Sequence, residues 1–244
     1  FVLGVETAFH PSKLMSAMGY PSRPAEDGPP SGGPPAESEV VKVKYSSDDP
    51  LALANFLTSA DIRLVRAEYI WSLCEAQKLL PRRQEAEDQS FESRSGRQTA
   101  LVTHQEVQRW AEGKSEALLC SISHCWETRE HPDPCGYQLD IIASASWWYA
   151  LAYYPAPVWL FIDYTSLFQY KREENSREAE SFEKAMNAMH LMYCHEFTLT
   201  LAVRSLTPRK LWQTKLEDGH KALIYHAKSG TIKEVPLEEL TQNL

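Results

Sequence analysis

The sequence lacks any excess of positive charge. Its 25 lysine and arginine residues stand against 33 aspartate and glutamate residues, which gives a formal net charge of -8. No cluster of lysine and arginine residues interleaves with aromatic side chains, so the chain carries no footprint for a phosphate backbone. We therefore expect no nucleic-acid partner.

Cysteine is also scarce, with five residues in 244. The number is odd, and a chain of this length does not need disulfides to hold its core, which is typical of proteins in a reducing compartment. We predict free, mostly buried thiols. The chain starts at Phe1 without an initiator methionine or an intact signal peptide. We interpret it as a processed product located in the cytoplasm or an organelle interior.

Standard metal motifs are missing too, because the sequence has neither paired C-x-x-C elements nor H-E-x-x-H. The one candidate ligand set has a spacing that fits no standard closed zinc site, so we predict no metal; this set comprises His124 or Cys125 with His131 and Cys135. A cysteine nucleophile would need an orienting group that the sequence does not locate. Its possible pairs are Cys125 with His131 and Cys194 with His195.

One long stretch lacks charge altogether: residues 141–162 read IIASASWWYALAYYPAPVWLFI, a length that could span a bilayer. Two prolines, Pro155 and Pro157, interrupt its second half, and Asp163 follows at once. This pattern predicts a helix, a turn and a buried strand in series rather than a transmembrane segment. Association with a membrane-bound assembly stays open.

The first part of the chain divides into two predicted segments. Residues 1–40 form a tail and a linker, because residues 20–39, YPSRPAEDGPPSGGPPAESE, are too rich in Pro, Gly, Ser and charge for a core. Residues 41–116 are predicted as a helical extension. Within it, EVVKVKY at residues 39–45 alternates apolar and polar side chains as a short strand does.

Local signals predict where the helices of this extension start and end. Asp49 followed by Pro50 is typical of an N-cap and a first helical position. Apolar residues recur at helical spacing in residues 61–81, and a polar loop is expected after Pro81. Thr103 and Glu106 then form a capping-box pattern before another helix.

Residues 117–244 are predicted as one α/β domain. Strands are expected at residues 117–123, 158–162 and 196–203, with helices from Gly136 and over residues 181–193 between them, the latter with its methionines in the core. Strictly alternating strands and helices indicate a mainly parallel sheet with flanking helices, and functional groups collect at the carboxyl ends of such strands.

Polar side chains gather after the first two of these strands. After the first, in SISHCWETREHPDP at residues 121–134, the side chains could surround a nucleotide-like ligand or close the strand end over the core; they are Ser123, His124, Trp126 and Glu127. After the second, the side chains could bond ribose hydroxyls or cap the loop; they are Asp163, Ser166 and Gln169.

These motifs resemble the HET-like branch of the TIR-like superfamily. The resemblance lies in SHCW followed by HPDP, in WLFIDYTSLFQ, and in FEKAMNAMHLMY, and it covers about residues 117–207. It implies a flavodoxin-like fold. Some members of the superfamily cleave NAD at its nicotinamide bond, and others act only through protein–protein contacts.

Catalytic relatives carry a glutamate after the third strand, in HET-like members within a Gly-Trp-Cys-x-x-Glu type of motif. Here the matching stretch, residues 207–221, keeps Trp212 and Glu217 but lacks the Gly-Trp-Cys core. The resemblance therefore implies Glu217 as the catalytic residue of an NAD glycohydrolase, with Glu127 as the less favoured choice. Either carboxylate would stabilise an oxocarbenium-like transition state.

Two functions follow. The favoured one is a non-catalytic interaction or structural module, an accessory subunit of a larger assembly that has protein partners and needs no cofactor. The degraded third motif and the proline-rich arm motivate it. The alternative is the NAD glycohydrolase, with NAD as substrate or ligand, motivated by the two retained strand-end motifs.

Overall fold

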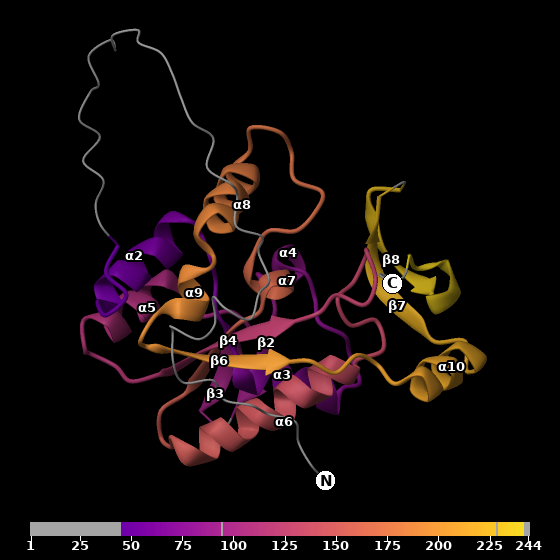
Figure 1. Ribbon diagram of the computed structural model, residues 1–244, viewed down its shortest axis with the longest axis horizontal. Coiled ribbons are helices and arrows are strands. Elements are labelled where there is room, and N and C mark those ends of the chain that lie inside the picture. The colour runs from indigo at the N-terminus through magenta and orange to yellow at the C-terminus, as the bar shows by residue number, and fades with distance from the viewer. Residues whose placement is uncertain (1–44, 94, 228, 242–244) are drawn as a thin grey trace, which may run out of the picture.

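Four strands form the central sheet of the protein (Figure 1). The structure is a computed structural model that describes residues 45–93, 95–227 and 229–241. The three longer strands are parallel, and the short β1 pairs antiparallel with β5. The strand order is β1 (Val65–Arg66), β5 (Val158–Phe161), β4 (Leu118–His124) and β6 (Thr198–Val203). The predicted α/β class with a mainly parallel sheet and flanking helices is confirmed.

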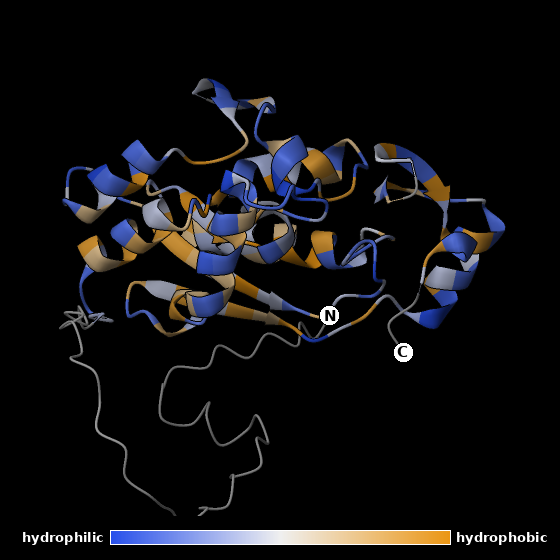
Figure 2. Cartoon of the chain, turned by 90° about the horizontal axis from the view of Figure 1, so that it is seen from above, coloured by the Kyte–Doolittle hydropathy of each residue, from blue (hydrophilic) through white to orange (hydrophobic). Residues whose placement is uncertain are grey.

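Helices α3 (Ala67–Glu75) and α6 (Tyr137–Ala152) cover one face of the sheet. Alternate strand residues point to opposite faces, because side chains in a strand repeat with a period of two. Ile122 and Leu160 accordingly pack with these two helices in a single apolar cluster. In Figure 2 the central strands are largely orange, for hydrophobic residues, whereas the helices around them carry many blue, hydrophilic stretches.

The opposite face carries a second apolar cluster, which includes Leu119 and Phe161. Four helices cover this face, two from the first half of the chain and two from the second half. These helices are α2 (Pro50–Ser59), α5 (His104–Ala111), α8 (Arg177–Ala188) and α9 (Leu191–Cys194). The parallel sheet is therefore buried on both faces, as parallel sheets require.

The two helix starts predicted from capping residues are confirmed by their hydrogen bonds. Asp49 Oδ1 accepts from the backbone N–H of Leu51 at 2.9 Å, with Pro50 as the first residue of α2. The Thr103 hydroxyl accepts from the backbone N–H of Glu106 at 3.2 Å, and a Glu106 carboxylate oxygen accepts from the Thr103 N–H at 2.8 Å. Both caps depend only on neighbouring residues, which is why the sequence predicts them.

The segment predicted as a helical extension, residues 41–116, is not purely helical. β1 places Val65 opposite Leu160 in the central sheet, so the helix predicted from residue 61 starts only at Ala67. The predicted polar loop after Pro81 contains a short helix and a hairpin: α4 (Arg83–Ala86), β2 (Ser90–Ser93) and β3 (Gly96–Thr99). The predicted tail and linker, residues 1–40, lie outside the described residues, as does the predicted strand before Tyr45.

The helix predicted over residues 181–193 is broken in two, because α8 ends at Ala188 and α9 begins at Leu191. The methionines differ in burial, and Met186 lies within α8, one residue and about 100° around the helix from the fully buried Ala185. Met192 is fully buried and Met189 is half-buried, whereas Met186 is 49% exposed. The prediction that these methionines fill the core is therefore wrong for Met186.

The charge-free segment 141–162 contains the rest of α6, a turn and β5, as predicted. No helix among the described residues has the length and apolar content that crossing a bilayer requires. All five cysteines are unpaired, but only two are buried: Cys120 and Cys135 are buried, Cys74 is half-buried, and Cys125 and Cys194 are exposed.

The C-terminal part forms a small unit beside the sheet. Its helix and hairpin enclose a third apolar cluster, to which Cys135 of the loop after β4 also contributes. The elements are α10 (Arg209–Glu217), β7 (Lys221–His226), β8 (Thr231–Pro236) and the 3-10 turn η1 (Leu237–Glu239). This unit therefore packs on the loop that contains the predicted ligand-binding residues.

Candidate functional site

The ends of β4 and β5 bring His124 and Asp163 together. The two strands are parallel neighbours, so their carboxyl ends meet at the same edge of the sheet. His124 Nε2 lies 3.1 Å from Asp163 Oδ1, and the indole N–H of Trp126 donates to Asp163 Oδ2 at 3.0 Å. The backbone N–H of Tyr164 also donates to Asp163 Oδ1, at 2.6 Å. Three donors therefore surround this carboxylate.

The second ring nitrogen of His124, Nδ1, lies next to the side chain of Gln138 on the first turn of α6. Gln138 Nε2 donates to the carbonyl of Cys125 at 2.9 Å and to Glu127 Oε1 at 3.0 Å, which fixes the orientation of its amide. Gln138 Oε1 consequently lies 3.1 Å from His124 Nδ1 as an acceptor. Both ring nitrogens of His124 face acceptors, an arrangement that requires the doubly protonated imidazolium.

The electrostatics of the pair agree with this protonation state. Burial disfavours the imidazolium, since the His124 side chain is only 1% exposed, yet the hydrogen bond and negative charge of Asp163 outweigh that cost and raise the pKa of His124. Burial likewise opposes ionisation of Asp163, but bonds from His124, Trp126 and Tyr164 hold its pKa below the usual value. Both pKa directions therefore favour the charged forms of this hydrogen-bonded pair.

Glu127 belongs to the same hydrogen-bond network through its contact with Gln138. Its Oε1 accepts from Gln138, from the backbone N–H of Thr207 at 2.7 Å and from the Thr207 hydroxyl at 2.9 Å. The residue is 7% exposed, and its Oε2 has no hydrogen-bond partner among the described residues. Glu127 therefore connects the loop after β4 to the loop after β6, with its carboxylate turned away from solvent.

The HPDP part of the loop is held by His131. Its Nε2 donates to the carbonyl of Leu80 at 3.0 Å, and its Nδ1 accepts from the backbone N–H of Asp133 at 3.0 Å. Complete burial lowers the pKa of His131 to about 4, so this ring is neutral. Both ring nitrogens are used, and the described residues contain no group of three or more side chains that could hold a metal ion.

The remaining predicted ligand-binding residues have different surroundings. Ser123 is exposed near the end of β4. Ser166 is buried, and its hydroxyl accepts from the backbone N–H of Ile162 at 3.0 Å. Gln169 donates to the carbonyls of Asp163, at 3.0 Å, and Leu167, at 2.9 Å. Ser166 and Gln169 thus close the loop around α7 (Asp163–Ser166), one of the two roles that the sequence left open.

Glu217, the predicted catalytic residue, is the last residue of α10 and is exposed. Figure 1 shows α10 to one side of the sheet, beside the β7–β8 hairpin and away from α7. Its helix is anchored by Trp212 and Leu216, which pack against the third apolar cluster. The contacts that join His124, Trp126, Glu127 and Asp163 do not include Glu217.

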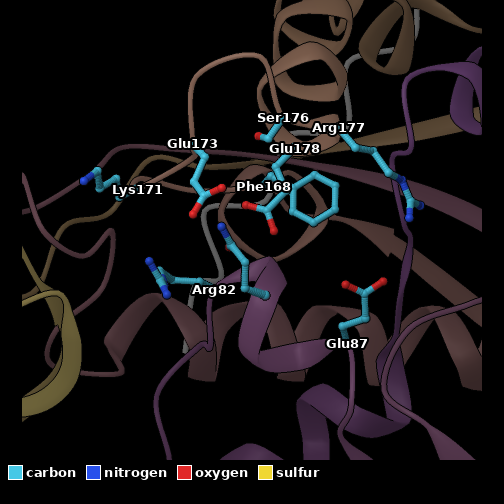
Figure 3. Close-up of a pocket in the computed structure, with 9 residues that line it drawn as sticks. Arg82, Glu87, Phe168, Lys171, Glu173, Ser176, Arg177 and Glu178 are labelled. Atoms are coloured by element: carbon cyan, nitrogen blue, oxygen red, sulfur yellow. The ribbon is translucent and has the colours of Figure 1, made fainter.

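An open cleft of about 520 Å³ lies beside this network rather than over it. Figure 3 shows Phe168 beside Glu178, with Lys171 and Arg177 on opposite sides. Three cationic and three anionic side chains line the cleft, so it does not favour a ligand of one charge sign. The lining residues are Arg82, Gln84, Glu87, Phe168, Lys171, Glu173, Ser176, Arg177 and Glu178, and none of the predicted site residues is among them.

Two members of the strand-end network were missed from the sequence, namely Gln138 and Thr207. Gln138 did carry a signal, because it is the one amide side chain in the mostly apolar α6 and a buried amide needs partners. Thr207 carried none, because its role depends on where the loop after β6 ends in space.

Comparison of the chain with protein-family models, with curated proteins and with solved structures found no match.

Proposed function

We propose that this chain is a non-catalytic TIR/HET-like interaction or structural module with a flavodoxin-like sheet, serving as an accessory subunit of a larger protein assembly. The observation that carries the proposal is a group of large apolar side chains exposed at the end of α6 and just after it. Their exposed fractions are 46% for Trp147, 59% for Trp148, 52% for Leu151, 53% for Tyr153 and 82% for Tyr154. We call these five residues the α6 patch.

The composition of α6 supports a partner at this patch. A helix on the surface of a monomer normally carries polar side chains on its outer face. Here no charged residue follows Asp140 until Asp163, so the outer face of the second half of α6 is uncharged. Large aromatic side chains bury about 150–250 Å² each, so the exposed parts of these five residues, four of which are aromatic, present roughly 500 Å². That area approaches the ~800 Å² per partner of a standard protein interface.

The strand-end network supports the non-catalytic half of the proposal. The carboxylates of Asp163 and Glu127 are each bound by three internal donors, and these bonds hold the loops after β4, β5 and β6 together. A carboxylate that stabilises a transition state must instead face the reacting atoms. We infer that the network is retained to shape the surface of the module.

The NAD glycohydrolase is the second candidate, and one observation favours it. The Asp163 side chain remains 27% exposed, and Ser123 near the end of β4 is also exposed, so a ligand can reach the strand ends. The two candidates are separated by incubating the protein with NAD and following nicotinamide release by chromatography, with Glu217→Gln and Glu127→Gln alongside. We expect no release from any of the three. Release that either variant abolishes would establish the enzyme instead.

The partner is tested by placing a photo-reactive amino acid at position 148 of the chain in its native cells. Position 170 is the matched control, because Tyr170 is also an aromatic residue exposed by 59%. We expect position 148 to cross-link to one protein of fixed mass and position 170 not to do so. We also expect Trp148→Glu to shift the chain from a large complex to the monomer in size-exclusion chromatography.

Two results would contradict the interaction module. The first is that the native chain elutes as a free monomer from cell extract. The second is that both positions cross-link to the same mixture of proteins, which would show contact without specificity.

A further inference from the structure

The outer edge of the central sheet, at β6, carries no further strand from the described residues. In the described part of the chain β6 pairs with no strand other than β4, so the backbone groups on its other side have no strand partner there, although the Thr198 N–H donates to the carbonyl of His195 at 3.0 Å. The strand reads TLTLAV at residues 198–203, with neither charge nor proline. An uncharged edge of this length is a ready template for another strand, and natural proteins usually cover or charge such edges.

The described chain begins at this edge. The ring of Tyr45 lies edge-on to His195, with the ring centroids 5.8 Å apart. The backbone N–H of Glu196 donates to the carbonyl of Ser47 at 2.9 Å, and His195 Nε2 lies 3.2 Å from the carbonyl of Asp49. Residues 45–49 are therefore held against the amino-terminal end of β6.

We propose that residues 39–45 add to the free edge of β6 as an antiparallel strand. Their sequence, EVVKVKY, alternates as a strand does. The chain reaches the beginning of β6 at Tyr45, so the residues before it can follow β6 only against its direction. At about 3.4 Å per residue, these seven residues are long enough to cover the six residues of β6.

Two unpaired hydroxyls at this point favour the addition. Tyr45 Oη and Thr198 Oγ1 are both buried, and neither has a hydrogen-bond partner among the described residues. Unpaired buried hydroxyls are costly, and the backbone of an added strand supplies both donors and acceptors. The backbone N–H and C=O groups of residues 39–45 could therefore serve as the hydrogen-bond partners that these two hydroxyls lack.

The alternation of the segment fits the two faces of the sheet. Tyr45 lies on the side of α9, where the Thr200 hydroxyl donates to the carbonyl of Tyr193. In the proposed strand Val41 and Val43 would share the face of Tyr45, because strand side chains repeat with a period of two. They would extend the apolar cluster under α8 and α9. Lys42 and Lys44 would lie on the other face and give the new sheet edge the charge that β6 lacks.

The test is backbone hydrogen exchange, followed by NMR, on the full 244-residue chain. We expect slow exchange for the amides of residues 40–44 and for those β6 amides that point away from β4, at least ~10-fold slower than in unstructured peptide. The Thr198 amide is left out of this set, because it already donates to the carbonyl of His195. In Val43→Pro, which removes a backbone N–H and breaks pairing, both sets should return to unprotected rates. The matched control is Ala36→Pro, which lies outside the proposed strand and should change neither set.

Unprotected amides at residues 40–44 of the wild-type chain would overturn the proposal. So would protection of the outer β6 amides that rises with protein concentration while residues 40–44 stay unprotected, since a second copy would then occupy the edge. Strand addition at β6 is independent of the α6 patch. A negative cross-linking result at position 148 would therefore leave the proposed strand standing, and unprotected amides at β6 would leave the proposed interaction module standing.

Discussion

Replacing Asp163 by asparagine tests the strand-end network directly. The asparagine amide has the shape of the carboxylate, but it lacks the negative charge, and its NH2 group must face a donor in place of the oxygen that accepted from either His124 or Trp126. Removing one partner of a buried charged pair costs about 3–5 kcal/mol. The Asp163 side chain is 27% exposed, so water recovers part of that cost. We expect the free energy of unfolding to fall by about 2–3 kcal/mol at pH 6, or about 5–10 °C in Tm.

The effect of this substitution depends on pH with a defined sign. The pKa of His124 is raised in the folded state, so its contribution is complete below the unfolded value of about 6.5 and is lost as pH rises through the folded value. The pKa of Asp163 is lowered, so its contribution is complete above about 3.9 and is lost as pH falls through the folded value. The difference between wild type and Asp163→Asn is therefore largest between about pH 4 and pH 6.5.

Urea denaturation followed by tryptophan fluorescence at pH 3, 6 and 9 measures this difference. Asp88→Asn is the matched control, because Asp88 is exposed and its loss should change the free energy of unfolding by less than about 0.5 kcal/mol. The reasoning is refuted if Asp163→Asn is as stable as this control at pH 6. It is also refuted if the loss is the same at all three pH values.

Three further substitutions test the surrounding contacts. Gln138→Leu leaves His124 Nδ1, the Cys125 carbonyl and Glu127 Oε1 without their shared partner, and should cost about 2–4 kcal/mol in urea denaturation; a cost under about 1 kcal/mol would contradict the network. Burial raises the pKa of Asp133 to about 6, so ionisation opposes folding above that pH. Asp133→Asn should therefore raise Tm at pH 8 and not at pH 4, and an equal change at both would show that ionisation is irrelevant. Trp148→Ser should leave the free energy of unfolding within about 1 kcal/mol of wild type, since Trp148 is 59% exposed, and a larger loss would place it in the core.

Local chemistry explains which parts of the fold the sequence predicted. The caps at Asp49 and Thr103 involve residues two or three positions apart. Each of the three long strands contains a short apolar run, and β5 (VWLF) is apolar throughout, as expected for a strand that is buried on both faces. β1 is only two residues long, so no periodicity reveals it. The hairpin at residues 90–99 is polar and mostly exposed, and its sequence is not distinguishable from that of a loop.

The candidate site divides in the same way. The sequence indicated that polar residues follow β4 and β5, and the parallel sheet brings His124 and Asp163 together although they are 39 residues apart. It did not indicate that Gln138 would bridge His124 and Glu127, or that Thr207 would bind Glu127 from 80 residues away. These partners depend on how the loops end in space, and no local pattern encodes that.

The sequence by itself therefore determined the α/β class, the helix caps, the buried strands and the strand ends at which polar residues collect, because each depends on short-range spacing and apolar periodicity. Only the tertiary structure decided that Asp163 and Glu127 bond to internal donors, that Glu217 lies apart on α10, and that the end of α6 remains uncovered. Those outcomes depend on which surfaces the packed chain brings into contact, and contact between distant segments is a property of the whole fold.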